Sequence, residues 1–267
     1  MLESTDTAVL PSRRGLLVPV ANPDGVAPLL AIAFAANAPD DPPTNVMAFV
    51  REQGREASPA HPPALAAAVE FATARGVPIA PQSLWSSNAG ADIVAAARKA
   101  NAGWILLGYH RAASGQDTMG GVVQDVFANA RTHPVHVGVF IQGTDQPFER
   151  IYAAVDSGHD GRAALDLAVR ITRSSNAKLR ALLVSSTVDQ PDEQDEMVDL
   201  LRDARRSLGR RFHSDVLSER SIDGLLHQTP GRLLIVGKKL ADEIRLPLGE
   251  APGGDRCMIV VQGGIPV

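Results

Sequence analysis

Short apolar runs alternate with helix-like segments along this chain of 267 residues, and this alternation limits its possible folds more than any other feature. Residues 16–21, for example, form a continuous apolar run, which is typical of a strand buried on both faces. Strands that alternate with helices along a chain usually form a parallel sheet, with the helices packed on its faces. The sequence therefore predicts an α/β fold.

The expected elements follow one order twice. The first set of strands is expected at residues 16–21, 45–50, 77–84, 104–108 and 135–141, with helices at 28–37, 63–75, 89–100 and 121–130. The second set has strands at 151–156, 179–185, 212–218, 232–237 and 258–262, with helices at 161–173, 192–208 and 221–228. The chain is therefore expected to contain one structural unit in two copies.

Direct alignment of the two copies supports this repeat. Residues 20–23 match residues 155–158, and the fourth strands match as 103–108 against 231–237. We expect a flexible lead-in at 1–13, a first domain at 14–142, a linker at 143–149 and a second domain at 150–264, because Gly143 and Pro147 mark a turn-rich connection.

Composition excludes several classes of function. The chain has 26 Lys and Arg against 30 Asp and Glu, which argues against a nucleic-acid partner, and an aromatic content of 4% argues against a base-stacking platform. The longest apolar stretch, residues 26–36, is too short for a bilayer, so no direct membrane insertion is expected. The single cysteine, Cys257, cannot form an internal disulfide, which favours a cytoplasmic location.

The segment after the fourth strand carries a family resemblance. Gly108-x-x-Arg111, followed by Gly121 and by a strand after His133-Pro134, resembles the universal stress protein domain. The resemblance implies two tandem domains, each an open, parallel five-stranded sheet with helices on both faces, packed as a pseudo-dimer. Residues 17–23 also resemble the stress-protein domains fused behind monovalent cation/proton antiporters. We expect strands 135–141 and 258–262 to pair, because each would otherwise be an exposed edge.

The same resemblance implies a ligand site at the carboxyl ends of the strands in the first copy, where N–H groups of a glycine loop and a helix start can hold phosphate. The candidate residues are Ala21, Asn22, Gly108, His110, Arg111, Gly120, Gly121 and Val122. Nucleotide-binding members of the family carry Gly-x2-Gly-x9-Gly-Ser/Thr and an aspartate after the first strand. Here Arg111 replaces the second glycine, Val122 the Ser/Thr and Ala21 the aspartate. Two interpretations stay open: a plain loop-to-helix turn, or a site for ATP, AMP or cyclic di-AMP.

The second copy departs from the family pattern in the opposite way. Asp156 keeps the aspartate position, but only about twenty residues separate Gly237 from the last strand, against about 26 between Gly108 and Pro134. The loop and helix after Gly237 are therefore expected to be shortened, and the second copy to be degenerate, with Ser157 or Asp160 capping its first helix.

No nucleophile, metal-ligand set or acid/base pair stands out, so no catalytic residue, metal ligand or required cofactor is expected. The resemblance implies a regulatory module in the cytosolic region of an inner-membrane transporter, on the same polypeptide or as its partner, and a homo-oligomer is expected. Two other functions stay open: a free-standing tandem stress protein that binds ATP, and a weak nucleotide hydrolase.

Overall fold

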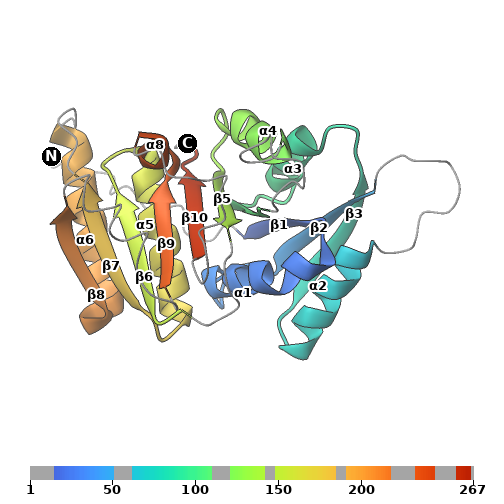
Figure 1. Ribbon diagram of the computed structural model, residues 1–267, viewed down its shortest axis with the longest axis horizontal. Coiled ribbons are helices and arrows are strands. Elements are labelled where there is room, and N and C mark those ends of the chain that lie inside the picture. The colour runs from blue at the N-terminus through green and yellow to red at the C-terminus, as the bar shows by residue number, and fades with distance from the viewer. Residues whose placement is uncertain are drawn as a thin grey trace, which may run out of the picture.

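A single sheet of ten strands runs through the whole molecule (Figure 1). The computed structural model describes residues 15–50, 62–109, 121–141, 148–184, 191–217, 232–243 and 257–265. The strand order is β3-β2-β1-β4-β5-β10-β9-β6-β7-β8, so the second half repeats the order of the first in reverse. This arrangement confirms two tandem α/β units.

The bounds of the elements agree with most of the expected ones. The first half contains β1 (Leu16–Val20), α1 (Val26–Ala36), β2 (Thr44–Val50), α2 (Pro63–Ala74), β3 (Ile79–Trp85), α3 (Ala89–Lys99), β4 (Trp104–Gly108), α4 (Gly121–Ala130) and β5 (His136–Ile141). The second half contains β6 (Arg150–Val155), α5 (His159–Ser174), β7 (Lys178–Val184), α6 (Pro191–Leu208), β8 (Phe212–Leu217), β9 (Arg232–Gly237), α8 (Lys238–Glu243) and β10 (Cys257–Gln262). The lead-in, residues 143–147 of the linker and the helix expected at 221–228 lie outside the described residues.

Helix α1 begins two residues earlier than the sequence suggested, at Val26. Pro28 lies in its first turn, where a missing N–H costs nothing because the first four N–H groups have no partner inside the helix. A short 3₁₀ turn, Pro23–Gly25, leads into it, and the side-chain oxygen of Asn22 accepts a hydrogen bond from the Asp24 N–H at 3.1 Å.

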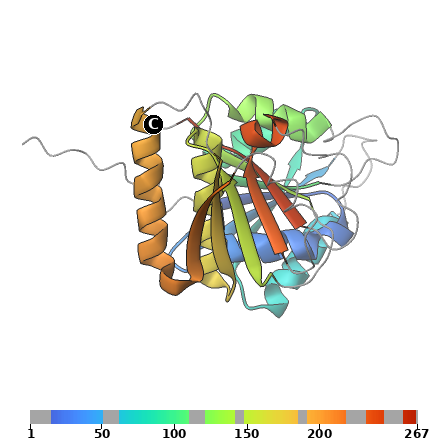
Figure 2. The same ribbon diagram turned by 60° about the vertical axis from the view of Figure 1, so that its left-hand side comes forward.

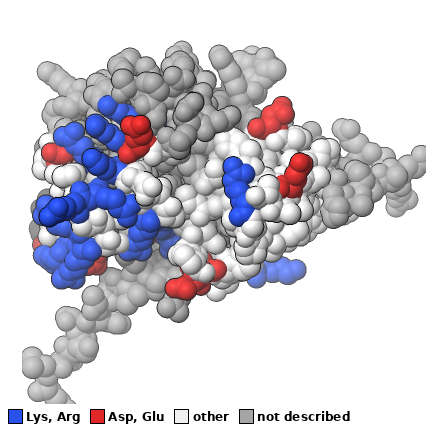
Figure 3. Space-filling model, turned by 90° about the horizontal axis from the view of Figure 1, so that it is seen from below, with Lys and Arg blue, Asp and Glu red and all other residues white. Residues whose placement is uncertain are grey.

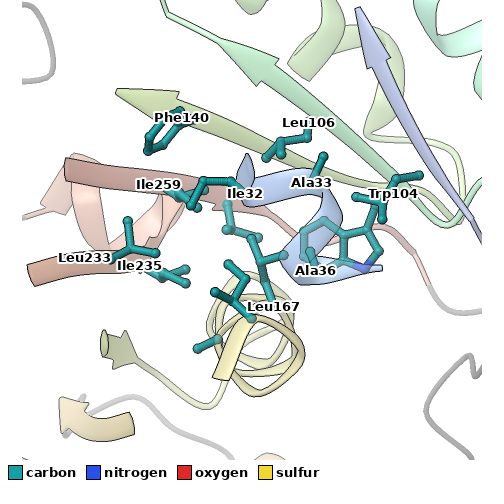
Figure 4. Close-up of a cluster of buried hydrophobic side chains, with 14 of the residues drawn as sticks. Ile32, Ala33, Ala36, Trp104, Leu106, Phe140, Leu167, Leu233, Ile235 and Ile259 are labelled. Carbon is teal, nitrogen blue, oxygen red and sulfur yellow. The ribbon is translucent and has the colours of Figure 1, made fainter. Parts of the chain in front are cut away.

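Helices cover both faces of the sheet, as expected. On one face α1, α2, α5 and α6 share one hydrophobic core that continues across both halves. On the other face α3 and α4 form a core in the first half, and α8 contributes to a separate one in the second. Figure 4 shows Ile32, Leu106, Leu167 and Ile259 from the shared core, and Figure 2 shows α5 behind the strands of the second half. The shared core makes one packed unit of two repeats.

The two halves meet along β5 and β10, the one antiparallel pair among the described strands. Their register runs from Met258 opposite Ile141 to Gln262 opposite Val137, which confirms the expected pairing. Beyond β10 the chain continues along the first half, where the Gly264 N–H donates to Nδ1 of His136 at 3.0 Å. The edges that two separate domains would expose are therefore used to join them.

Helices α1 and α5, which follow the first strand of each half, also pack against each other at this seam. The Arg170 guanidinium lies 2.9 Å from Asp166 on its own helix and 3.4 Å from Asp41, just after α1. The hydroxyl of Ser174 donates to the carbonyl of Ala35.

In the described part of the chain, no helix combines the length and the apolar character needed to cross a bilayer.

Candidate ligand-binding site

The topology places one switch point in each half, and we call the region at the carboxyl ends of its two strands the crevice of that half. In the first half β1 pairs with β4, and the helices that follow, α1 and α4, lie on opposite faces of the sheet. In the second half β6 pairs with β9, and α5 and α8 likewise lie on opposite faces. Ligands of open parallel sheets bind at such points, where the connections that follow two neighbouring strands go to opposite faces of the sheet.

In the first half, α4 begins at Gly121, which is exposed. Among the described residues, an added Cβ there would meet nothing within 4 Å. Val122 is 44% exposed, and Ala21 and Asn22 are also exposed just after β1. Gly108 is partly buried at the end of β4, the strand next to β1.

The first half has Ala21 after β1, at the position where the second half has Asp156, and so offers no carboxylate there. The neighbouring Asn22 directs its side-chain oxygen to the N–H of Asp24 in its own turn. His110, Arg111 and Gly120 lie outside the described residues, so their roles stay predictions.

The crevice of the second half is closely packed around Asp156. This carboxylate follows β6 and is 7% exposed. Burial raises its pKa above the ordinary value of 3.8; the charge of Lys239 opposes this, and Asp160 and Glu243 add to it. Within the described residues, Oδ1 of Asp156 and the hydroxyl of Ser157 have no hydrogen-bond partner. Asp156 is thus a buried acid held in a setting that favours its neutral form.

Gly161 makes this close packing possible. An added Cβ at Gly161 would lie 2.2 Å from the carbonyl oxygen of Asp156 and 2.3 Å from its Oδ1. Any other residue would push α5 away from the end of β6. Sequence reasoning did not single out Gly161, although a glycine early in an otherwise amphipathic helix is a known signal of close backbone approach.

The prediction that Ser157 or Asp160 caps α5 is wrong. The residue at the N-cap is Gly158, and no side chain caps it. Asp160 instead accepts hydrogen bonds from two other elements, from the Lys239 N–H in α8 at 3.0 Å and from the Gly263 N–H after β10 at 2.8 Å. Ser157 is no cap either, because Gly158 occupies the position from which a side chain could reach the free N–H groups.

The hydrogen bond from the Lys239 N–H to Asp160 affects whether a phosphate could bind in the second crevice. Helix α8 begins directly after β9, and one of its first N–H groups is already bonded to the carboxylate of Asp160. The ammonium groups of Lys238 and Lys239 lie next to Asp242 and Glu243, one helical turn further on. A phosphate at this helix start would therefore compete with the carboxylate of Asp160 for the Lys239 N–H.

Helix α8 lies where the sequence predicts a shortened loop and helix after Gly237, although its bounds were not predicted. With six residues it is too short to display a helical period, and its i,i+4 ion pairs are the one local signal.

Comparison with known proteins identifies the fold. Neither a protein-family model nor a curated protein matches the sequence. Among solved structures, a universal stress protein from Archaeoglobus fulgidus has a TM-score of 0.55 and 14% identity over 94% of this chain and 97% of its own. The cytoplasmic domain of a prokaryotic cation chloride cotransporter has a TM-score of 0.56 and 12% identity over 93% of this chain and 95% of its own. The chain therefore has the fold of universal stress proteins in tandem, a fold it shares with a transporter's cytoplasmic domain.

Proposed function

We propose that this chain is a non-catalytic regulatory module of a membrane ion transporter, located at the cytosolic face, and that its first half binds an adenine nucleotide or a cyclic dinucleotide. The observation that carries the transporter part is the similarity to a cotransporter's cytoplasmic domain, which extends over nearly the full length of both chains. The resemblance of residues 17–23 to antiporter-fused domains points the same way, to a cation/proton antiporter as the partner.

The contrast between the two crevices supports the first half as the binding half. Gly121 leaves the start of α4 open, whereas Asp160 occupies the corresponding helix start in the second half. Backbone N–H groups at a free helix start can donate hydrogen bonds to phosphate oxygens, and the local dipole favours the negative charge. The chain's own part in binding would be to hold phosphate at this helix start and to add the guanidinium of Arg111 as a further donor.

Tyr109 offers a physical route from this site to the rest of the molecule. It follows Gly108 directly, and its N–H donates to the Phe140 carbonyl of β5 at 2.8 Å. Its partly buried side chain packs against the hydrophobic cores of both halves on that face of the sheet. A ligand beside Gly108 would therefore lie next to a side chain that contacts both halves. If the ligand binds one relative arrangement of the two halves more tightly than another, it shifts the protein towards that arrangement. This shift would be the regulatory signal.

A thermal-shift panel with ATP, AMP, NAD and cyclic di-AMP tests the binding part. A ligand present at about a hundred times its dissociation constant should stabilise the protein by about 2.7 kcal/mol. The variant Gly121→Leu should lose this shift because its side chain fills the open helix start, and Asp156→Ala in the other crevice should keep it. A shift that survives Gly121→Leu but disappears in Asp156→Ala would overturn the choice of half. The lack of a shift with every compound would overturn the nucleotide site.

Arg111 provides a second test of the same site. If its guanidinium holds a phosphate, Arg111→Gly should weaken binding by about 1.5–3 kcal/mol, the range for a charge-assisted hydrogen bond. Titration calorimetry with ATP and with cyclic di-AMP measures this change. Tighter ATP binding by Arg111→Gly would mean that the arginine obstructs the site.

A free-standing tandem stress protein is the second candidate, favoured by the similarity to the Archaeoglobus fulgidus protein over 97% of its length. The reading frame that encodes this segment separates the two candidates. Several apolar segments of about 20 residues each in the same frame would support the transporter module. A frame that codes only for the two repeats would favour the stress protein.

A further inference from the structure

Positive charge is concentrated on one edge of the second half, although the chain as a whole has a net charge of −4. Figure 3, which views the molecule from below, shows Lys and Arg gathered over the second half and sparse over the first. We call this surface the basic edge and define it by the cations at the starts of β6, β7 and β9 and at the ends of α5 and α6. Its members are Arg150, Arg173, Lys178, Arg180, Arg205, Arg206, Arg210, Arg211 and Arg232. The acids among them are Glu149, Asp203 and Asp215.

The centre of the basic edge is a row of cations on three neighbouring strands. Arg150 lies opposite Lys178 on one side and opposite Arg232 on the other in the parallel register. Residues at such positions point to the same face of a sheet, and like charges placed there repel each other. Among the described residues, no ion pair joins Arg150 or Lys178 to an acid. In the described part of the chain, Arg150 and Lys178 therefore lie beside other cations without an acid paired to them.

Part of the basic edge has a structural role, which must be separated from the remainder. Arg211 donates to the carbonyls of Thr172 and Ser175 at 2.8 and 2.6 Å, and so satisfies the end of α5. Arg180 is paired with Asp215, and Arg206 with Asp203. Cations are also favoured at helix ends for electrostatic reasons. Arg150 and Lys178 have neither role, since they lie at the starts of strands.

We propose that the basic edge docks onto an anionic phospholipid surface. The cations extend across several strand starts and two helix ends, so they match an array of phosphates better than one small anion. Most of these cations are arginines, and one guanidinium group can donate two parallel hydrogen bonds to the oxygens of one phosphate. An aromatic platform for nucleic-acid bases is lacking in the described part of this edge, where Tyr152 is 6% exposed and lies beneath Arg232. The choice of a membrane rests on the proposed transporter function, which would hold the module beside a charged leaflet.

Vesicle co-sedimentation tests this proposal without a transporter or a nucleotide. The full chain should bind vesicles that contain phosphatidylglycerol and should not bind vesicles of phosphatidylcholine alone. The triple variant Arg150→Gln, Lys178→Gln and Arg210→Gln should bind at least tenfold more weakly, because each cation near the surface contributes to the attraction. The matched control, Arg98→Gln, Lys99→Gln and Arg131→Gln, removes the same charge from exposed positions of the first half and should bind like wild type. Circular dichroism confirms that both variants fold.

Several results would overturn the proposal. These are no binding to anionic vesicles, equal binding to neutral ones, or an equal loss in both triple variants. Duplex DNA that competes at the same salt concentration and loses affinity only with the first triple variant would assign the edge to nucleic acid instead. Loss of vesicle binding between 0.1 M and 1 M salt is expected, because the screening length falls from about 10 Å to about 3 Å. A failed nucleotide panel would leave these measurements unaffected, so the two proposals fail separately.

Discussion

Gly161 and Gly121 occupy the first turns of helices in opposite halves, but their surroundings differ sharply. A Cβ at Gly161 would lie well inside contact distance of the Asp156 backbone, while a Cβ at Gly121 would meet no atom of the described residues within 4 Å. The same substitution therefore tests close packing at one position and serves as its own control at the other.

Gly161→Ala is expected to lower the free energy of unfolding by about 3 kcal/mol, at the upper end of the range for overpacking, because backbone atoms must move. Gly121→Ala should change it by less than about 1 kcal/mol, in the direction of greater stability, since alanine favours helix. Urea unfolding followed by circular dichroism measures both. Equal midpoints for the two variants would show that α5 can move away from β6 at little cost.

Asp156 should make stability depend on pH in a particular direction. Its pKa is raised in the folded protein, so ionisation of the carboxyl opposes folding, and the stability it contributes at low pH is lost as pH rises through the raised pKa. Asp156→Asn removes this loss. The variant should therefore gain stability relative to wild type as the pH rises from the ordinary pKa of 3.8 through the raised pKa of Asp156. Urea midpoints at several pH values measure the gain, and a constant difference would contradict the assignment.

At the scale of elements, Asp160 ties three of them together by accepting bonds from α8 and from the chain after β10 while it belongs to α5. Asp160→Ala leaves two N–H groups without their acceptor and should cost about 2 kcal/mol, as hydrogen bonds to charged groups do. Asp242→Ala, which removes an exposed i,i+4 partner of Lys238, should cost less than about 1 kcal/mol. Chemical denaturation compares the two, and similar losses would mean that the Asp160 bonds add little.

The elements that could be predicted from sequence are those with a long local signal. The apolar runs of β1 and β4 and the start of α4 at Gly121 follow from residues close together in the chain. The placement of Gly108 and Gly121 at one end of the sheet follows from parallel topology. The role of Asp160 could not be predicted, because its partners are 79 and 103 residues away in the chain. Both partners are backbone N–H groups, which almost every residue type has, so no residue pattern marks them. A shortened helix after Gly237 was expected, but the bounds of α8 could not be predicted because its six residues span less than two turns.

At the scale of the whole molecule, the core shared by α1 and α5 makes separate unfolding of the halves unfavourable. Both tryptophans, Trp85 and Trp104, lie in the first half, and Leu167 lies at the seam in the second (Figure 4). Leu167→Ala should cost about 2–5 kcal/mol. We expect the urea midpoint from tryptophan fluorescence to fall as far as the midpoint from circular dichroism. A fluorescence midpoint that stays at its wild-type value would show that the halves unfold independently.

The pairing of β5 with β10 inside one polypeptide has an evolutionary consequence. In a symmetric homodimer a single gene encodes both copies, so every substitution appears on both sides of the dyad. Here each repeat has its own coding sequence within one gene, so mutations can accumulate in one repeat while selection preserves the other. The carboxylate of Asp160 in one crevice and the open start of α4 in the other are the kind of specialisation that gene duplication and fusion allow.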